Sequence, residues 1–174
     1  ALPISHMAAA GIPNGATITK LAWNKSSAFG TTAGNNTDSF KIFLHNSTLS
    51  GVASLFGNSF NTLVAPATLV YAKGNQIIPT STGYVVFDFS TNPFTYNGGS
   101  LEIGVSWDCS IYSGNPSTGG YTWTDDLIAN RVLGGSNSTS TISLAPVGNR
   151  SQIQITYTPP PPCTGTPNAG NAGV

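Results

Sequence analysis

The sequence predicts an all-β protein that folds as a single antiparallel β-sandwich, jelly-roll-like in its number of strands. Ser, Thr, Asn and Gly make up 77 of the 174 residues; Thr favours strands, whereas Gly, Asn and Ser favour turns. Short segments in which apolar and polar residues alternate recur along the chain, and no window keeps a helical period beyond a single turn. Only 7% of the residues are charged, so solubility depends on uncharged polar groups.

Segments with strand-like alternation are spread over the whole chain. Ser5–Met7 (SHM) looks like a cloning scar, but residues 3–13 read equally well as a native strand, and we take them as native. The segment around Pro66 is expected to be an edge strand or two short pieces, because proline cannot donate to a ladder. The segments with the clearer patterns are 16–25, 38–47, 62–74, 83–90, 98–110, 119–126, 127–135 and 151–159.

The apolar residues on one face of these segments form the expected core. Burying them between two sheets is the natural way for so many half-apolar strands to pack. They are Leu21, Trp23, Phe40, Ile42, Leu44, Phe87, Leu101, Ile103, Val105, Trp107, Ile153 and Ile155.

Four prolines, Pro159–Pro162, follow the last strand-like segment. They stop any sheet and form a stiff, extended spacer. We therefore expect one domain over residues 1–158 and a Pro/Gly-rich linker over residues 159–174.

Composition also restricts the class of partner. The six basic residues are scattered and balance six acidic residues, so no basic stripe is present to bind nucleic acid. No apolar run approaches 18 residues, so no membrane span is expected. Few Lys and Glu among many Ser, Thr and Asn favour an extracellular protein.

Two stretches, AAGIPNGATITKLAWNKSSAFGTT and STGYVVFDFSTNPFTYNGGSLEIGVSWDCS, resemble a β-sandwich module of large secreted Bacteroidetes proteins. The resemblance extends from about Ala8 to Tyr157. PPPPCTGTPNAG is similar to the linker and first residues of the immunoglobulin-like module that often follows. The resemblance implies a non-catalytic module at the cell surface, adhesive or carbohydrate-binding, whose partners are a glycan or surface ligand and neighbouring domains of the same polypeptide. The alternative is a structural spacer that binds nothing.

Catalytic constellations are absent from the sequence pattern. A hydrolase triad needs a histidine beside a nucleophile and an acid, and the two histidines, His6 and His45, lie in no such motif. Glu102 is the single Glu; Asp88 could lie beside it if their strands were neighbours, which would suggest a cation or a lysine partner. A solvated sheet face is the better interpretation, and we expect no enzyme.

The aromatic residues around the longest loop are the candidate ligand-binding residues: Tyr112, Tyr121 and Trp123. Sugars stack their C–H faces on exposed rings, but Tyr121 and Trp123 fit equally well as inward-packing neighbours on one strand. Asp125 and Asp126 could hold calcium with loop carbonyls; otherwise no cofactor is expected.

Cys109 and Cys163 are the two cysteines. A bridge between them would close a loop of more than 50 residues and contribute roughly 4 kcal/mol in the chain-entropy model. We predict this disulfide for an oxidising compartment. The resemblance implies a competing arrangement, in which Cys163 pairs inside the next module.

Overall fold

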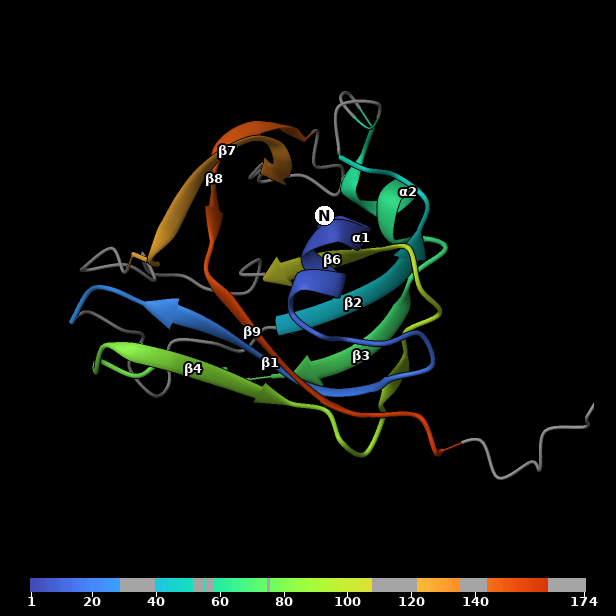
Figure 1. Cartoon of the computed structure of the whole chain (residues 1–174). Helices are drawn as coiled ribbons and strands as arrows, with labels where there is room; N and C mark the ends of the chain where they lie inside the picture. The colour runs from blue at the N-terminus through green and yellow to red at the C-terminus, as the bar shows by residue number, and fades with distance from the viewer. Residues whose placement is uncertain are drawn as a thin grey trace, which may run out of the picture.

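The computed structural model describes residues 1–28, 40–51, 55, 58–74, 76–107, 122–134 and 144–162. Two antiparallel sheets pack face to face, and a two-stranded ribbon rises from one end of them (Figure 1). The predicted all-β sandwich is therefore confirmed. The elements are α1 (Ile4–Ala9), β1 (Thr17–Lys25), β2 (Phe40–Ser47), α2 (Phe60–Val64), β3 (Thr68–Lys73), β4 (Gly83–Asp88), β5 (Phe94–Thr95), β6 (Ser100–Trp107), β7 (Asp125–Gly134), β8 (Ala145–Ser151) and β9 (Ile153–Thr158).

The first sheet, here called the β1 sheet, is built around β1. On one side β1 pairs with β9, where Leu21 lies opposite Ile155. On the other side it pairs with β4, where Leu21 lies opposite Phe87, and then with β5. Because the side chains alternate, Leu21, Phe87 and Ile155 point inward from three neighbouring strands.

The second sheet, here called the β2 sheet, has the order β3–β2–β6. β3 is its edge, which confirms the edge strand expected in residues 62–74, although Phe60–Val64 form the short helix α2 instead of strand. The N-terminal segment lies against the free side of β6, where Leu2 and Leu101 exchange backbone hydrogen bonds of 2.8 and 2.9 Å.

The core lies between the two sheets. Phe87 stacks on Phe40 with a centroid distance of 4.9 Å, and Trp23 and Tyr71 meet Phe87 edge-on. Offset and edge-on aromatic pairs of this kind stabilise beyond the area that they bury. Six of the expected core residues are buried, namely Leu21, Phe40, Ile42, Leu44, Phe87 and Leu101, and four more pack partly buried against them, namely Trp23, Ile103, Ile153 and Ile155.

The expectation for Val105 was wrong, because its side chain is 42% exposed. Val105 lies on β6, and the N-terminal segment bridges this strand at Leu101, four residues away. Within the described residues, that cover does not extend to Val105. The side chain of Trp107 lies outside the described part of the structure.

The N-terminal residues form a helix where the sequence reads as a strand. Pro3 occupies the N-cap with extended backbone angles, and Gly11 follows the helix with a φ of 69° that glycine adopts readily. Met7 is 1% exposed and fixes α1 to the core. Burial of this one side chain, together with three alanines of high helix propensity, favours a short helix.

β8 and β9 are one length of chain that changes partner at Gln152. The N–H of Gln152 donates to Thr124 (2.8 Å), and its carbonyl accepts from the N–H of Asn24 (3.1 Å). Before this point β8 pairs with β7, and after it β9 pairs with β1. β7 and β8 therefore diverge from the β1 sheet as a curved ribbon (Figure 1).

The C-terminal boundary of the sheet lies where the sequence predicts it. β9 ends at Thr158, and Pro159–Pro162 form no strand. Residues 163–174 lie outside the described residues. In the described part of the chain, neither helix has the length and apolar character needed to cross a bilayer.

Candidate functional site

The free edge of β9 borders a groove of about 510 Å³, here called the β9 groove. Its volume falls within the range of ligand sites, roughly 300–1,000 Å³. Its lining comes from α1 and the residues next to it, which form one wall, from β8 and β9, and from Tyr84 of β4. The described residues that line it are Leu2, His6, Met7, Ala10, Ile12, Tyr84, Arg150, Ser151, Gln152, Ile153, Gln154, Ile155 and Tyr157.

Alternation along β9 makes the groove amphipathic. Ile153 and Ile155 pack against the core, whereas Gln154 points to the opposite face and is exposed. Among the described strands β9 pairs with β1 alone, so its other edge is left to face the groove. The groove thus offers apolar, amide and backbone groups along one strand.

Two contacts hold α1 at the wall of the groove. Nη1 of Arg150 lies 2.9 Å from Nδ1 of His6, and the hydroxyl of Tyr157 donates to the carbonyl of Gly11 at 2.8 Å. An arginine can only donate, so Nδ1 of His6 is the acceptor and the hydrogen of the neutral ring is on Nε2. These contacts define the orientations of the His6 ring and of the Gly11 carbonyl.

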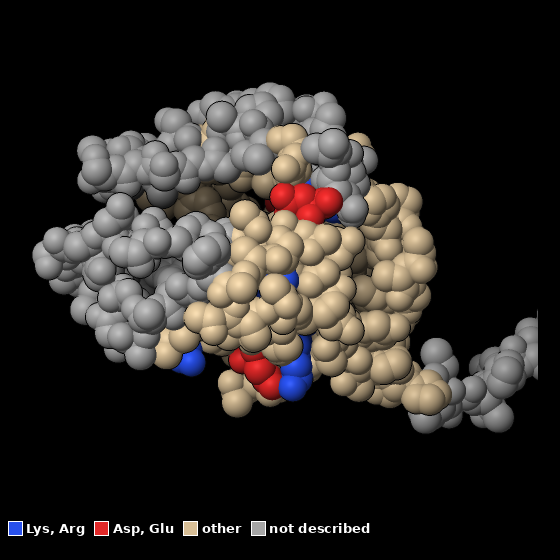
Figure 2. Space-filling model, turned by 90° about the vertical axis from the view of Figure 1, so that its left-hand side faces the viewer, with Lys and Arg blue, Asp and Glu red and all other residues tan. Residues whose placement is uncertain are grey.

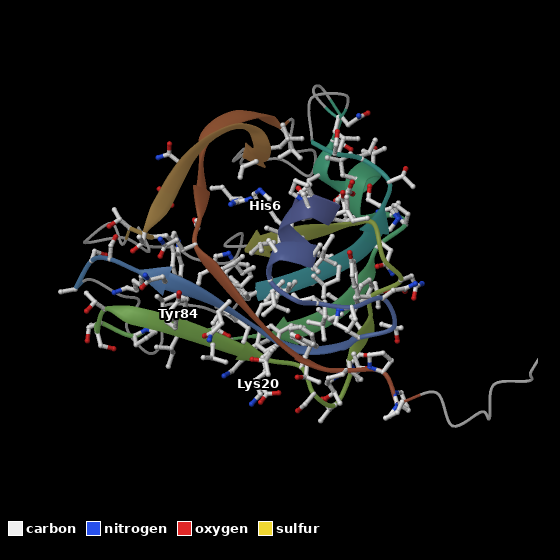
Figure 3. The ribbon with its side chains drawn as sticks, viewed as in Figure 1. His6, Lys20 and Tyr84 are labelled. Carbon is white, nitrogen blue, oxygen red and sulfur yellow. The ribbon has the colours of Figure 1, made fainter. Side chains whose placement is uncertain are left out.

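The opposite end of the groove carries an exposed aromatic ring. Tyr84 is 51% exposed and lies beside Asn24 on the neighbouring strand. The amide of Asn24 donates to Oε1 of Gln152 at 3.0 Å, which fixes both amide groups next to the ring. In Figure 3, His6 and Tyr84 lie on either side of the strand formed by β8 and β9.

Charge is unevenly distributed in the groove. Arg150 is a permanent cation, and the described lining residues include no Asp or Glu. Charged side chains are sparse elsewhere as well, as Figure 2 shows for one face of the molecule. Asp126, whose side chain is not described, lies opposite Arg150 on β7.

Of the three candidate aromatic residues from the sequence, Trp123 is described, and it does not line this groove. Trp123 is partly buried against the core and bridges to Lys25 through the backbone. This is the inward arrangement that the alternation also allowed. Tyr112 and Tyr121 lie outside the described residues, so the predicted set of three stays a prediction.

The candidate calcium ligands lie at the start of β7. Asp125 is exposed and accepts a 3.3 Å hydrogen bond from Nδ2 of Asn149. Asp126 is opposite Arg150 in the ribbon, and its side chain is not described. Among the described residues, no group of three His, Cys, Asp or Glu side chains could hold a metal ion. Cys109 and Cys163 also lie outside the described residues, which leaves their pairing a prediction.

Asp88 and Glu102 are not neighbours, contrary to the arrangement considered from the sequence. β4 pairs with β1 and β6 pairs with β2, so the two carboxylates lie on different sheets. Asp88 instead pairs with a lysine of its own sheet, because Nζ of Lys20 lies 2.6 Å from its Oδ2. Hydrogen bonds from Lys20 and Ser90 hold the pKa of Asp88 well below its usual range.

Sequence reasoning missed most residues of the groove. His6 lies on a helix read as a strand, and Arg150 lies on β8, which showed no strand pattern. The alternation of residues 151–157 does place Gln152 and Gln154 on the outer face, but it does not reveal that α1 faces them.

Comparison of the chain with protein-family models, with curated proteins and with solved structures finds no match. The function must therefore be argued from the geometry of the groove.

Proposed function

We propose that this chain is a non-catalytic ligand-binding module that binds a glycan in the β9 groove. The observation that carries the proposal is the exposed ring of Tyr84 beside the fixed amides of Asn24 and Gln152. A ring offers a flat apolar surface for the C–H face of a sugar, and the amides offer donors and acceptors for its hydroxyls.

The shape of the groove supports the same function. It is an open channel along a strand edge, lined by alternating apolar and amide side chains. A chain-like ligand with repeated hydroxyl groups matches such a surface better than a compact, fully enclosed molecule does. We place the module in a secreted or surface-anchored bacterial protein, as its composition and its resemblance to Bacteroidetes modules suggest.

A structural spacer is the alternative. It is favoured by the Pro159–Pro162 segment, which leaves β9 directly and packs close to the sheet, since a Cβ placed on Gly15 would lie 3.2 Å from Cβ of Pro160. Such a short connection would transmit the orientation of this domain to a following one.

Glycan binding separates the two functions. The purified chain should bind a subset of an immobilised glycan array, with calcium and with chelator. Tyr84→Ala should weaken this binding about tenfold, because stacking on one ring contributes about 1 kcal/mol or more.

Val86→Ala is the matched control. Val86 lies two residues along the same strand, points the same way and is 56% exposed, but it does not line the groove. Its loss should leave glycan binding unchanged. Absence of binding to every glycan would favour the spacer, and equal effects of the two variants would exclude the β9 groove as the site.

A further inference from the structure

We propose that Asn97 is a site of spontaneous covalent modification, at which its side-chain amide is converted to aspartate or isoaspartate. Neither Asn97 nor Gly98 lines the β9 groove, so this modification goes beyond the proposed function and does not depend on it.

The reaction needs only the chain and water. The backbone nitrogen of Gly98 loses its proton and attacks Cγ of Asn97, and the side-chain nitrogen leaves as ammonia. Water then opens the resulting cyclic imide at one of its carbonyls, which gives aspartate or isoaspartate. A glycine after asparagine favours ring closure, because no side chain hinders the approach to its nitrogen.

The sequence contains two Asn–Gly pairs, Asn14–Gly15 and Asn97–Gly98. Asn14 and Asn97 are both exposed, and the glycines that follow them have φ values of 83° and 80°. The two turns also lie next to each other, since a Cβ placed on Gly98 would lie 3.6 Å from Cγ of Asn14. Solvent access and backbone φ therefore do not distinguish the two pairs.

The attacking nitrogen does distinguish them. The N–H of Gly15 donates to the carbonyl of Tyr96 at 2.7 Å, so this hydrogen bond must break before Gly15 can attack Asn14. No described residue accepts a hydrogen bond from the N–H of Gly98. Breaking one backbone hydrogen bond slows such a step about fivefold or more. Of the two pairs, Asn97–Gly98 is therefore the one with an available nucleophile.

The contacts of Asn97 hold its backbone and leave its side chain to rotate. Oδ1 of Asn46 accepts from the N–H of Asn97 at 3.0 Å, and Nδ2 of Asn46 donates to the carbonyl of Thr95 at 3.0 Å. The side-chain amide of Asn97 is exposed and has no hydrogen-bond partner among the described residues. Its Cγ can therefore turn towards the nitrogen of Gly98.

Residues 96–99 join β5 of the β1 sheet to β6 of the β2 sheet. This crossing is tight, since a Cβ placed on Gly99 would lie 2.7 Å from the carbonyl oxygen of Ser47. Isoaspartate adds a carbon atom to the main chain at the crossing, whereas aspartate changes only the side chain. We therefore expect the isoaspartate form, and not the aspartate form, to be less stable than the unmodified chain.

The test incubates the purified chain in a mildly alkaline buffer made with water enriched in heavy oxygen, which marks every carboxylate formed during the incubation. Peptide mapping by mass spectrometry then follows both pairs. In the folded chain, Asn97 should be converted about fivefold or more faster than Asn14. In guanidinium chloride, where the hydrogen bond of Gly15 is lost, the two should be converted at similar rates.

Asn97→Gln and Asn14→Gln are matched variants, because glutamine keeps the amide but forms its cyclic imide far more slowly. Asn97→Gln should remove the acidic species that ion exchange separates from the incubated chain, and Asn14→Gln should leave it. Asn97→Asp reproduces the charge without the added main-chain atom. Its melting temperature should match that of the wild type, and the isolated isoaspartate form should melt at a lower temperature.

Equal conversion of Asn97 and Asn14 in the folded chain, or faster conversion of Asn14, would overturn the proposal. The same preference for Asn97 in guanidinium chloride would overturn it as well, because neighbouring residues and not the hydrogen bond of Gly15 would then select the site. An isoaspartate form that melts with Asn97→Asp would overturn the role of the tight crossing. The comparison of the two pairs uses the wild-type chain, so it holds even if a variant does not fold.

Discussion

The outer faces of the two sheets differ in how much of them is covered by other parts of the chain. On the β2 sheet, α2 covers the outer face: the ring of Phe60 meets Phe43 edge-on at 6.1 Å, and a Cβ placed on Gly104 would lie 2.9 Å from Cγ1 of Val64. On the β1 sheet, Tyr84 and Val86 are 51% and 56% exposed on the outer face.

The cross-strand charge pairs show the same contrast. Lys20 and Asp88 lie opposite each other on the β1 sheet, with side chains 39% and 47% exposed, and Lys20 points away from the core (Figure 3). His45 and Glu102 lie opposite each other on the β2 sheet at 3.3 Å. There, Oε1 of Glu102 is buried, and no described residue donates to it.

The difference shows that the elements packed against a sheet face decide whether that face contributes to the fold or stays exposed to ligands. On the β2 sheet, Phe43 provides an apolar side chain and Gly104 leaves a gap, and α2 packs against both. This outer face therefore contributes to the stability of the fold. The outer face of the β1 sheet keeps an exposed ring and exposed polar side chains, and the candidate ligand site lies at its edge.

The largest effect that tests this contrast is the loss of Phe43. Phe43→Ala should lower the free energy of unfolding by about 2 kcal/mol, less than for a fully buried Phe because the side chain is half-buried. Val86→Ala on the open face should change it by less than about 0.5 kcal/mol. Chemical denaturation measures both, and equal effects would show that α2 does not cover the β2 sheet in solution.

A smaller effect is expected from filling the gap beneath α2. Gly104→Ala should destabilise by about 1–2 kcal/mol, because the new methyl group overlaps Val64 and the packing must shift. In a Val64→Ala background the same change should be neutral or stabilising, because alanine is better than glycine in a strand. A destabilisation of the same size in both backgrounds would mean that α2 is not the obstacle.

The interaction between His45 and Glu102 on the covered face should be dispensable for stability. Glu102→Met keeps the length of the side chain and removes a carboxylate oxygen that is buried without a described donor. The free energy of unfolding should rise by about 1 kcal/mol, because buried unpaired acceptors are destabilising. A clear decrease would show that the interaction with His45 outweighs this burial.

The smallest effect concerns acid stability on the open face. The lowered pKa of Asp88 means that its ion pair stabilises the fold above the unfolded pKa, about 3.9, and that this contribution is lost as the pH falls below it. The stability difference between the wild type and Asp88→Asn should therefore shrink between pH 5 and pH 2. Because the pair is largely exposed, salt should reduce the difference at neutral pH, and a salt-independent difference would contradict this.

Periodicity predicted the strands that alternate and the core residues that they carry. Residues such as Leu21, Ile42 and Leu101 could be assigned because each belongs to a run of alternating apolar residues on the inner face of its sheet. The segment APVGNRS could not, since Pro146 and Gly148 disfavour a strand and only pairing with β7 makes it one. α1 depends on the burial of Met7, and the β9 groove depends on α1, so the site could not be predicted from local pattern.

The pairing of β1 with β9 determines the order in which the molecule can form. Thr19 and Thr156 share a hydrogen bond although they are 137 residues apart. Because β4 precedes β9 in the chain, β1 can pair with β4 before β9 has been synthesised, but its other edge then has no β9 to pair with. Closure of such a long loop is slow, and it exposes an unpaired edge to other chains. The β1 sheet includes the strand that lines the groove, so a nascent chain stopped before Ile153 would lack both a complete β1 sheet and the candidate binding site.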